Sequence, residues 1–259
     1  DYALTKTLMK KAGKLGFLSI PVPENYGGME MGFVSTMLVC DYISGATGSL
    51  STAFGAHTGI GILPILLYGT ESQKQEYLPK LASGEWFASY CLTEPGAGSD
   101  ANSGKTKAIL SEDKTHYEIT GQKMWISNAG FASLFIVFAR IEDDKNITGF
   151  IVPFNQNNGI ELGEEEKKLG MKGSSTTALV FENAKIPVKN LLFKVGEGAN
   201  IAFNCLNIGR LKLGASTLGG AKMVVNGVTP YAKERRAFGQ PISKLDANKK
   251  KIEAMNIST

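Results

Sequence analysis

The sequence predicts an α+β fold with three consecutive regions, because the spacing of its apolar residues changes twice along the chain. Apolar residues recur at helical spacing from residue 1 to about 85. Short apolar runs separated by turn residues follow to about 194, and helical spacing returns from 195. We therefore expect an N-terminal helical domain at 1–85, a β-domain at 86–194 and the beginning of another helical domain at 195–259.

The first region carries helical patterns and one capping signal. One helical face near its start contains Leu4, Leu8, Ala12 and Leu15. Phe33–Tyr42 continues the same periodicity. Thr70 and Gln73 have the spacing of a capping box. This signal predicts a helix over 70–78, which Pro79 then ends.

The second region contains short strand patterns bounded by turn residues. Its runs are His116–Thr120, Leu134–Ile141, Gly149–Phe154 and Ala178–Phe181. Many short strands at this spacing predict a sandwich or a barrel. The charged run Glu164–Lys168 is expected to be a solvated loop.

The third region is again helical in its periodicity. The pattern covers Gly198–Lys222 and carries on through Met223–Lys233, and a last helical segment covers Leu245–Met255. The three lysines at 249–251 are expected to form a solvated helix face.

The composition is that of an ordinary globular protein, with 43% hydrophobic and 20% charged residues. A net charge of +4 is small for 259 residues, and the lysines are scattered, which argues against nucleic-acid binding. His57 and His116 are too few for a histidine-rich metal site, so both are expected to be structural. Cys40, Cys91 and Cys205 are odd in number and widely spaced, which indicates buried thiols in a reducing compartment.

No pattern of a signal peptide or of a membrane-spanning segment stands out. Gly59–Leu67 is apolar, but it is short and interrupted by Gly and Pro, so a soluble protein is expected. Asp1 already lies in a helical pattern without an initiating Met. We expect the chain to begin part-way into a longer protein.

The most informative stretch is Tyr90–Asp100, a strand pattern that ends in a tight turn. We call the turn, Glu94–Asp100, the cradle, because its glycines and backbone N–H groups suit an anion. Gly96-x-Gly98-x-x-Ala101 formally fits the dinucleotide fingerprint, but the residues that follow are poor helix formers. No Walker lysine follows either. An ordinary hairpin turn remains the alternative on these residues alone.

Three further strings occur in a recognisable order with this stretch. They are Ile20–Gly28 (IPVPENYGG), Gly121–Asn128 (GQKMWISN) and Glu234–Gly239 (ERRAFG). Together with Tyr90–Asp100 (YCLTEPGAGSD), they resemble the acyl-CoA dehydrogenase family of flavoproteins over essentially the whole chain. Asn207-x-Gly209-Arg210 is most similar to the very-long-chain branch. The resemblance implies a helical domain, an antiparallel β-sandwich or barrel, and the first part of a C-terminal helical bundle.

The resemblance also implies FAD as the cofactor and a fatty acyl-CoA as the substrate. The residues implied to line the flavin are Tyr90, Leu92, Thr93, Gly98, Ser99, Trp125, Ile126 and Ser127. Arg235 and Phe238 match residues that reach the FAD of a neighbouring subunit, which implies a homodimer or homotetramer. Ser99, Asn207 and Arg210 match substrate-side positions.

The same residues have plainer interpretations without the resemblance. Trp125 would be a β-core aromatic and Ser99 a turn-capping hydroxyl. Arg235 would be a cation complementing a helix end, and Arg210 an ordinary surface residue.

The catalytic residue is not assigned. Family members use a glutamate as the base, either on a later C-terminal loop or, in two branches, directly before the arginine that matches Arg210. This chain has Gly209 at that position, so we expect the base in a segment beyond this chain.

The implied activity is α,β-dehydrogenation of an acyl-CoA to the trans-2-enoyl-CoA, with electrons passed to an electron-transfer flavoprotein. The alternatives are an acyl-CoA oxidase, a flavin monooxygenase, or a catalytically inert flavin- or acyl-CoA-binding fragment, including a relative kept for its interface. The expected location is the cytoplasm for a bacterial protein and the mitochondrial matrix for a eukaryotic one. Contact with a membrane would involve only regions beyond this chain.

Overall fold

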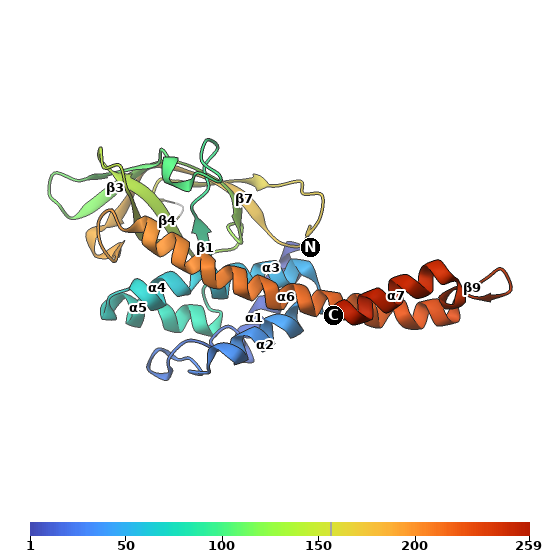
Figure 1. The fold of residues 1–259 in the computed structure, drawn as a ribbon. Coiled ribbons are helices and arrows are strands. Elements are labelled where there is room, and N and C mark those ends of the chain that lie inside the picture. Colours follow the sequence, from blue (N-terminus) through green and yellow to red (C-terminus); the bar gives the residue numbers. More distant parts are fainter. Residues whose placement is uncertain (156) are drawn as a thin grey trace.

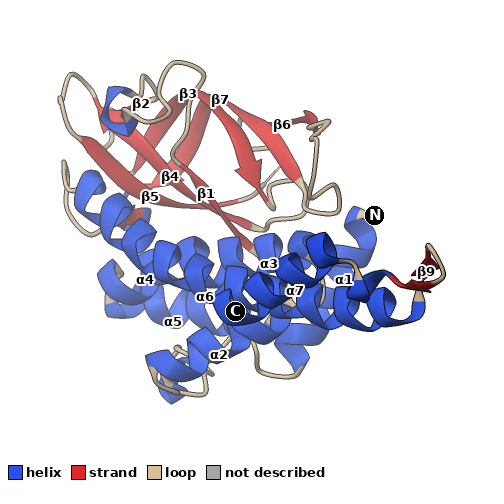
Figure 2. Cartoon of the chain, turned by 45° about the vertical axis from the view of Figure 1, so that its right-hand side comes forward, coloured by secondary structure: helices blue, strands red, loops and turns tan. Residues whose placement is uncertain are grey.

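The computed structural model describes residues 1–155 and 157–259, which form a twisted sheet above a layer of helices (Figures 1 and 2). One long helix, α6 (Gly198–Glu234), runs between the two layers and continues beyond them as one side of a projecting two-helix arm (Figure 1). The predicted α+β class with helix, sheet and helix in that order is confirmed.

The N-terminal layer is helical throughout. Its helices are α1 (Tyr2–Lys14), α2 (Phe33–Ser44), α3 (Gly48–Gly55), the π-helical turn η2 (Ala56–Gly61), α4 (Leu63–Tyr68) and α5 (Glu71–Ser83), with a short 3-10 turn at Glu24–Tyr26. The Asp1 side chain accepts hydrogen bonds from the N–H groups of Ala3 and Leu4 and so caps α1.

Helix α5 begins as predicted and ends later than predicted. Thr70 and Gln73 form the reciprocal capping box, with both hydrogen bonds present. Pro79 lies inside the helix and does not end it. The helix continues because Leu81 and Ala82, which follow the proline, are buried in the core.

Eight strands form the main sheet. They are β1 (Ala88–Cys91), β2 (Lys107–Leu110), β3 (His116–Ser127), β4 (Leu134–Ile141), β5 (Ile147–Pro153), β6 (Ile160–Glu165), β7 (Thr176–Pro187) and β8 (Leu191–Leu192). The order is β6-β7-β3-β2-β4-β5-β8, with β1 paired to β4. Most pairs are antiparallel as expected, but β4 runs parallel to both β1 and β2.

Strand β4 is the central element of the core, because it is buried on both faces. Its residues Leu134, Ile136 and Phe138 belong to the cluster that packs the sheet onto the helices. Phe135 and Val137, which point the other way, belong to the cluster inside the β-layer. This is why β4 has a continuous apolar run in place of an alternating pattern.

The charged run at 164–168 is not simply a loop, so that expectation is wrong for its first part. Glu165 ends β6, and its carboxylate accepts hydrogen bonds from Ser175 Oγ at 2.6 Å and from the Thr176 N–H at 2.8 Å. Pairing with β7 and this carboxylate contact together extend the strand into the charged run.

The C-terminal region is the helix α6, a small hairpin of β9 (Arg236–Ala237) and β10 (Gln240–Pro241), and the helix α7 (Asp246–Ser258). The two helical patterns predicted before residue 234 form one continuous helix of 37 residues. The lysines at 249–251 are exposed on α7, as predicted. All three cysteines are free and buried, which is also as predicted.

The helical segment Gly48–Tyr68 is long and apolar enough to cross a membrane by length and composition alone. In the folded chain, however, 67% of its most apolar window is buried inside the protein. In the fold, this segment is part of the core and packs against β1.

His57 lies in this segment and is structural, as expected. The imidazole is fully buried, its Nδ1 accepts a hydrogen bond from the Ala88 N–H at 3.1 Å, and its Nε2 pairs with the Leu81 carbonyl at 3.0 Å. Because an N–H must donate and a carbonyl must accept, these partners fix the neutral tautomer with the proton on Nε2. Burial lowers the pKa of His57 to about 4, and the nearby Lys212 charge also lowers it.

The burial of His57 predicts a loss of stability in mild acid. The unfolded imidazole binds a proton near pH 6.5, whereas the folded one does so near pH 4, so the unfolded state binds more protons between these values. We expect the free energy of unfolding to fall by about 2 kcal/mol between roughly pH 7 and pH 5 in urea titrations. His57→Gln should remove most of this dependence; an equal slope in both proteins would contradict the assignment.

A second prediction concerns the crossing of α6 over α2. A Cβ on Gly219 would lie 1.9 Å from the Asp41 carbonyl oxygen, so the two helices approach each other through this glycine. We expect Gly219→Ala to lower the free energy of unfolding by about 2 kcal/mol. Gly214→Ala is the matched control on the same helix, because its Cβ would meet nothing within 4 Å. In the control, the free energy of unfolding measured in urea should stay unchanged or rise by up to about 1 kcal/mol. A similar loss of stability in both variants would refute the close approach of the two helices at Gly219.

Candidate active site

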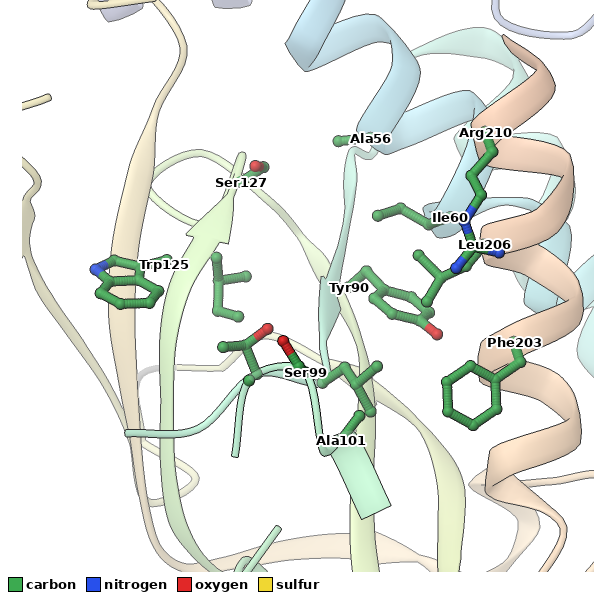
Figure 3. A pocket seen from close by; sticks show the side chains of 14 residues that line it. Ala56, Ile60, Tyr90, Ser99, Ala101, Trp125, Ser127, Phe203, Leu206 and Arg210 are labelled. Carbon is green, nitrogen blue, oxygen red and sulfur yellow. The ribbon is translucent and has the colours of Figure 1, made fainter. Parts of the chain in front are cut away.

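A cavity of about 330 Å³ lies where the sheet, η2 and α6 meet (Figure 3). Its walls come from η2, the end of β1 with the cradle, the end of β3, and one face of α6. The lining residues are Ala56, Ile60, Tyr90, Leu92, Thr93, Gly98, Ser99, Ala101, Trp125, Ile126, Ser127, Phe203, Leu206 and Arg210. Nine of the twelve predicted site residues are therefore together in one place.

The cradle follows β1 directly. Glu94 and Ala97 exchange two backbone hydrogen bonds of 3.1 Å, which close the turn. A Cβ on Gly98 would meet nothing within 4 Å, so this glycine keeps open space at the cavity wall. Only a single 3-10 turn, Ala101–Ser103, separates the cradle from β2. The helix that a dinucleotide fingerprint requires does not occur in this described stretch, which confirms that interpretation of the sequence.

Trp125 does not belong to the β-core, because a bulge in β3 turns it outward. The pairing of β3 with β7 shifts register between Lys123 and Ile126. Trp125 adopts a φ of 58°, which is rare for a bulky residue, and its side chain is 60% exposed at the edge of the cavity. Such backbone conformations gather at functional sites. The alternative interpretation of Trp125 as a core aromatic is wrong.

Helix α6 forms the opposite wall. Arg210 runs from α6 along the cavity toward Leu206 and Tyr90 (Figure 3). Asn207 does not line the cavity; its side-chain oxygen accepts a hydrogen bond from the Arg210 guanidinium. Asn207 therefore orients Arg210, which is the residue of this pair that faces the cavity.

Several hydroxyl groups at the cavity have no partner within the described part of the chain. Tyr90 Oη is buried and unpaired, and burial raises the pKa of Tyr90 well above its ordinary value, with Cys205 adding to the shift. The hydroxyls of Thr93, Ser99 and Ser127 also form no hydrogen bond with the described residues, but Thr93 and Ser127 are half-buried and Ser99 is exposed. Buried polar groups normally find partners, so the unpaired Tyr90 hydroxyl at this cavity indicates a place for a polar ligand.

Arg235 and Phe238 lie elsewhere, on the hairpin at the far end of the arm (Figure 1). Phe238 is 89% exposed, and the Arg235 backbone ends α6 through a hydrogen bond to the Tyr231 carbonyl at 2.8 Å. The structure does not bring these two residues to the cavity.

A second cavity, of about 630 Å³ and mainly apolar, adjoins the first. The two share Ala56, Ile60, Ser127, Leu206 and Arg210. The second cavity extends between α2, α3 and α6 to Met223 and Val224, and its walls include the glycines 48, 55, 209 and 220. The sequence reasoning missed this space, because glycines facing each other across two helices leave no periodic signal in one chain.

The sequence reasoning also missed a buried ion pair behind the cradle. Lys123 Nζ lies 2.7 Å from Glu94 Oε1, and both side chains are almost fully buried. Burial opposes the charge on Glu94, but Lys123 and the hydrogen bonds from Thr106 and Lys105 hold the pKa of Glu94 below its ordinary value. Burial lowers the pKa of Lys123, and Glu94 opposes that shift. The signal in the sequence was a lone lysine at an inward position of β3.

The chain is similar to several known proteins. It is 49% identical over 248 residues to a probable acyl-CoA dehydrogenase of Bacillus subtilis, covering 96% of this chain and 41% of the relative. It is 36% identical over 252 residues to the mitochondrial very long-chain specific acyl-CoA dehydrogenase of Rattus norvegicus, covering 94% and 38%. A crystal structure of an acyl-CoA dehydrogenase from Bacillus anthracis complexed with FAD superposes with a TM-score of 0.95 at 46% identity, covering 98% and 44%.

The chain thus spans about two fifths of the length of these relatives. Three family models match it in succession: the N-terminal domain of acyl-CoA dehydrogenase at 1–85, the middle domain at 89–184 and the C-terminal domain at 196–259. Since these matches cover nearly every residue, and in the order that the motifs indicate, the chain belongs to the acyl-CoA dehydrogenase family.

Proposed function

We propose that the protein containing this chain is an FAD-dependent dehydrogenase that converts an acyl-CoA into the trans-2-enoyl-CoA. The observation that carries the proposal is the first cavity, where the cradle, the bulged end of β3 and Arg210 of α6 surround the buried, unpaired hydroxyl of Tyr90. Bound FAD would supply the hydride acceptor that no amino-acid side chain provides. The sequence family and its FAD-bound relative support the same assignment.

The residues around the cavity fit a flavin. An isoalloxazine ring has two apolar faces and one polar edge, and the cavity offers both kinds of surface. Trp125 and Ile126 provide apolar contact, while the hydroxyls of Thr93 and Ser127 provide donors for the polar edge. The open space at Gly98 lets the cofactor approach the backbone of the cradle.

The second cavity suits the acyl chain. It is mainly apolar and continues from the first cavity, so a thioester at the junction would direct its chain along α6. Arg210 at the junction offers a planar fork of donors for oxygen atoms of the CoA portion, and Ser99 offers a hydroxyl. Lys212 also borders this space, but its Nζ donates to Thr58 Oγ1 at 2.7 Å.

The base that removes the α-proton comes from outside the described residues in this proposal. None of the described residues lining either cavity is a carboxylate or an imidazole. Gly209 in the second cavity leaves room beside Arg210 where another segment of the protein could place a glutamate. The chain therefore supplies binding and orientation, and the remainder of the protein supplies the proton acceptor.

Further parts of the proposal concern assembly. Arg235 and Phe238 are exposed and remote from the chain's own cavity, which suits contact with the FAD of a second subunit in a homodimer or homotetramer. An electron-transfer flavoprotein is the proposed electron acceptor. The three reduced cysteines suit the bacterial cytoplasm or the mitochondrial matrix.

Flavin reduction by an acyl-CoA tests this function. The purified full-length protein should show the two-band yellow spectrum of oxidised flavin, bleach anaerobically on addition of an acyl-CoA, and release the enoyl-CoA. Immediate recovery of the colour in air would favour an oxidase or a monooxygenase. Bound flavin that no acyl-CoA bleaches would indicate an inert binding protein, and a colourless protein that takes up no FAD would refute the proposal.

Gly98 provides a second test. We expect Gly98→Val to weaken FAD binding at least about tenfold, because its side chain would enter the cavity, while thermal stability stays nearly unchanged. Gly96→Val is the matched control, since a Cβ there also meets nothing within 4 Å but Gly96 does not line this cavity. Equilibrium titration with FAD measures the affinity of each variant. Equal affinities for Gly98→Val and Gly96→Val would count against the assigned site.

A further inference from the structure

The buried pair of Glu94 and Lys123 lies behind the first cavity without lining it. Glu94 directly follows Thr93, and Lys123 stands two positions before Trp125. The pair therefore joins the two segments between which the proposed flavin would lie.

Each partner also holds backbone groups of other segments. Lys123 Nζ donates to the Leu92 carbonyl at 3.2 Å, just after the end of β1. The Glu94 carboxylate accepts from the N–H groups of Lys105 and Thr106, the latter at 3.1 Å, just before β2 begins. Charge-assisted hydrogen bonds of this kind are short and directional. One buried charge pair thus fixes the end of β1, the cradle, β2 and β3 relative to one another.

The pair also borders the bulge that exposes Trp125. Lys123 is paired with Leu179 of β7, and regular pairing resumes only at Ile126. The Met124 N–H donates to the Thr93 carbonyl at 3.0 Å, which links the bulge to the strand that leads into the cradle. The Lys123 side chain is directed inward, whereas the bulge turns Trp125 outward to the edge of the cavity.

Stability alone is a weak reason for such a pair. Replacing a buried ion pair with neutral side chains of similar volume is often harmless to stability, because two charges must be removed from water to form it. What neutral side chains do not reproduce is the set of directional contacts to three backbone groups in two segments.

We infer that Glu94 and Lys123 are positioning residues for the flavin, which set the spacing between the cradle and the Trp125–Ser127 segment without touching the cofactor. This inference rests on the proposed function. The inferred role of the pair is to set the affinity for FAD and the surroundings of the flavin ring, in addition to any contribution to folding.

The test compares the double variant Glu94→Gln/Lys123→Met with the unaltered protein. The double variant removes both charges together, so neither is left buried without a partner. We expect far-UV circular dichroism and melting temperature to change little. FAD affinity should fall roughly tenfold, as expected for loss of about one well-placed hydrogen bond to the cofactor, and the visible flavin bands should shift.

The matched control is Glu76→Gln/Lys189→Met, which removes an exposed ion pair of the same type with an N–O distance of 3.0 Å. It should leave both FAD affinity and the flavin spectrum unchanged. If the main double variant fails to fold, Glu94→Asp replaces it. The aspartate keeps the charge but is one methylene shorter, so it loses simultaneous contact with Lys123 and Thr106, and its FAD affinity should fall similarly.

The outcomes separate this inference from the proposed function. An unaltered protein that binds no FAD would overturn both. An unaltered protein that binds FAD, together with a folded variant of equal affinity and identical spectrum, would overturn only the positioning role. A variant that loses melting temperature but keeps affinity and spectrum would likewise show that the pair serves folding alone.

Discussion

Strand β1 is held at both ends by buried polar side chains, and the first cavity is built outward from it. At its start, His57 accepts the Ala88 N–H; just beyond its end, Lys123 donates to the Leu92 carbonyl. Parallel pairing with β4 supports its middle. Strand β1 is thus attached to a strand that is buried on both faces. The position of the cradle, which follows β1 directly, is therefore set by the position of this strand.

The side chains that hold β1 in place are paired, whereas the Tyr90 hydroxyl at the cavity is not. Around β1, each polar group of His57, Glu94 and Lys123 meets a defined partner. A few residues away, Tyr90 Oη is buried without one. Since leaving a buried hydroxyl unpaired costs about 1–3 kcal/mol, its position at the cavity indicates that the missing partner belongs to a ligand.

Much of the fold followed from local signals, whereas most of the site residues came from the resemblance of four sequence strings to a known family. The capping box at Thr70, the apolar run of β4 and the cradle each depend on a few neighbouring residues, so one chain displays them. Pro79 misled because burial of the residues after it outweighs its local effect. Without the resemblance, Trp125 read as a core aromatic, since the bulge that exposes it is decided by pairing with a distant strand. The second cavity depends on facing glycines of α3 and α6, which only the tertiary structure brings together.

The same distinction explains why the motifs indicate binding more fully than catalysis. Several groups of a cofactor site can come from one strand and the turn after it, as Tyr90 to Ser99 do at the first cavity. A base for proton abstraction is a single side chain that any segment can supply, provided it reaches the α-carbon. No described residue that lines either cavity is a carboxylate or an imidazole, and Arg235 and Phe238 lie on the arm, away from both cavities. In the proposed function, the chain therefore supplies binding and orientation, and the base and the subunit contacts come from other polypeptide.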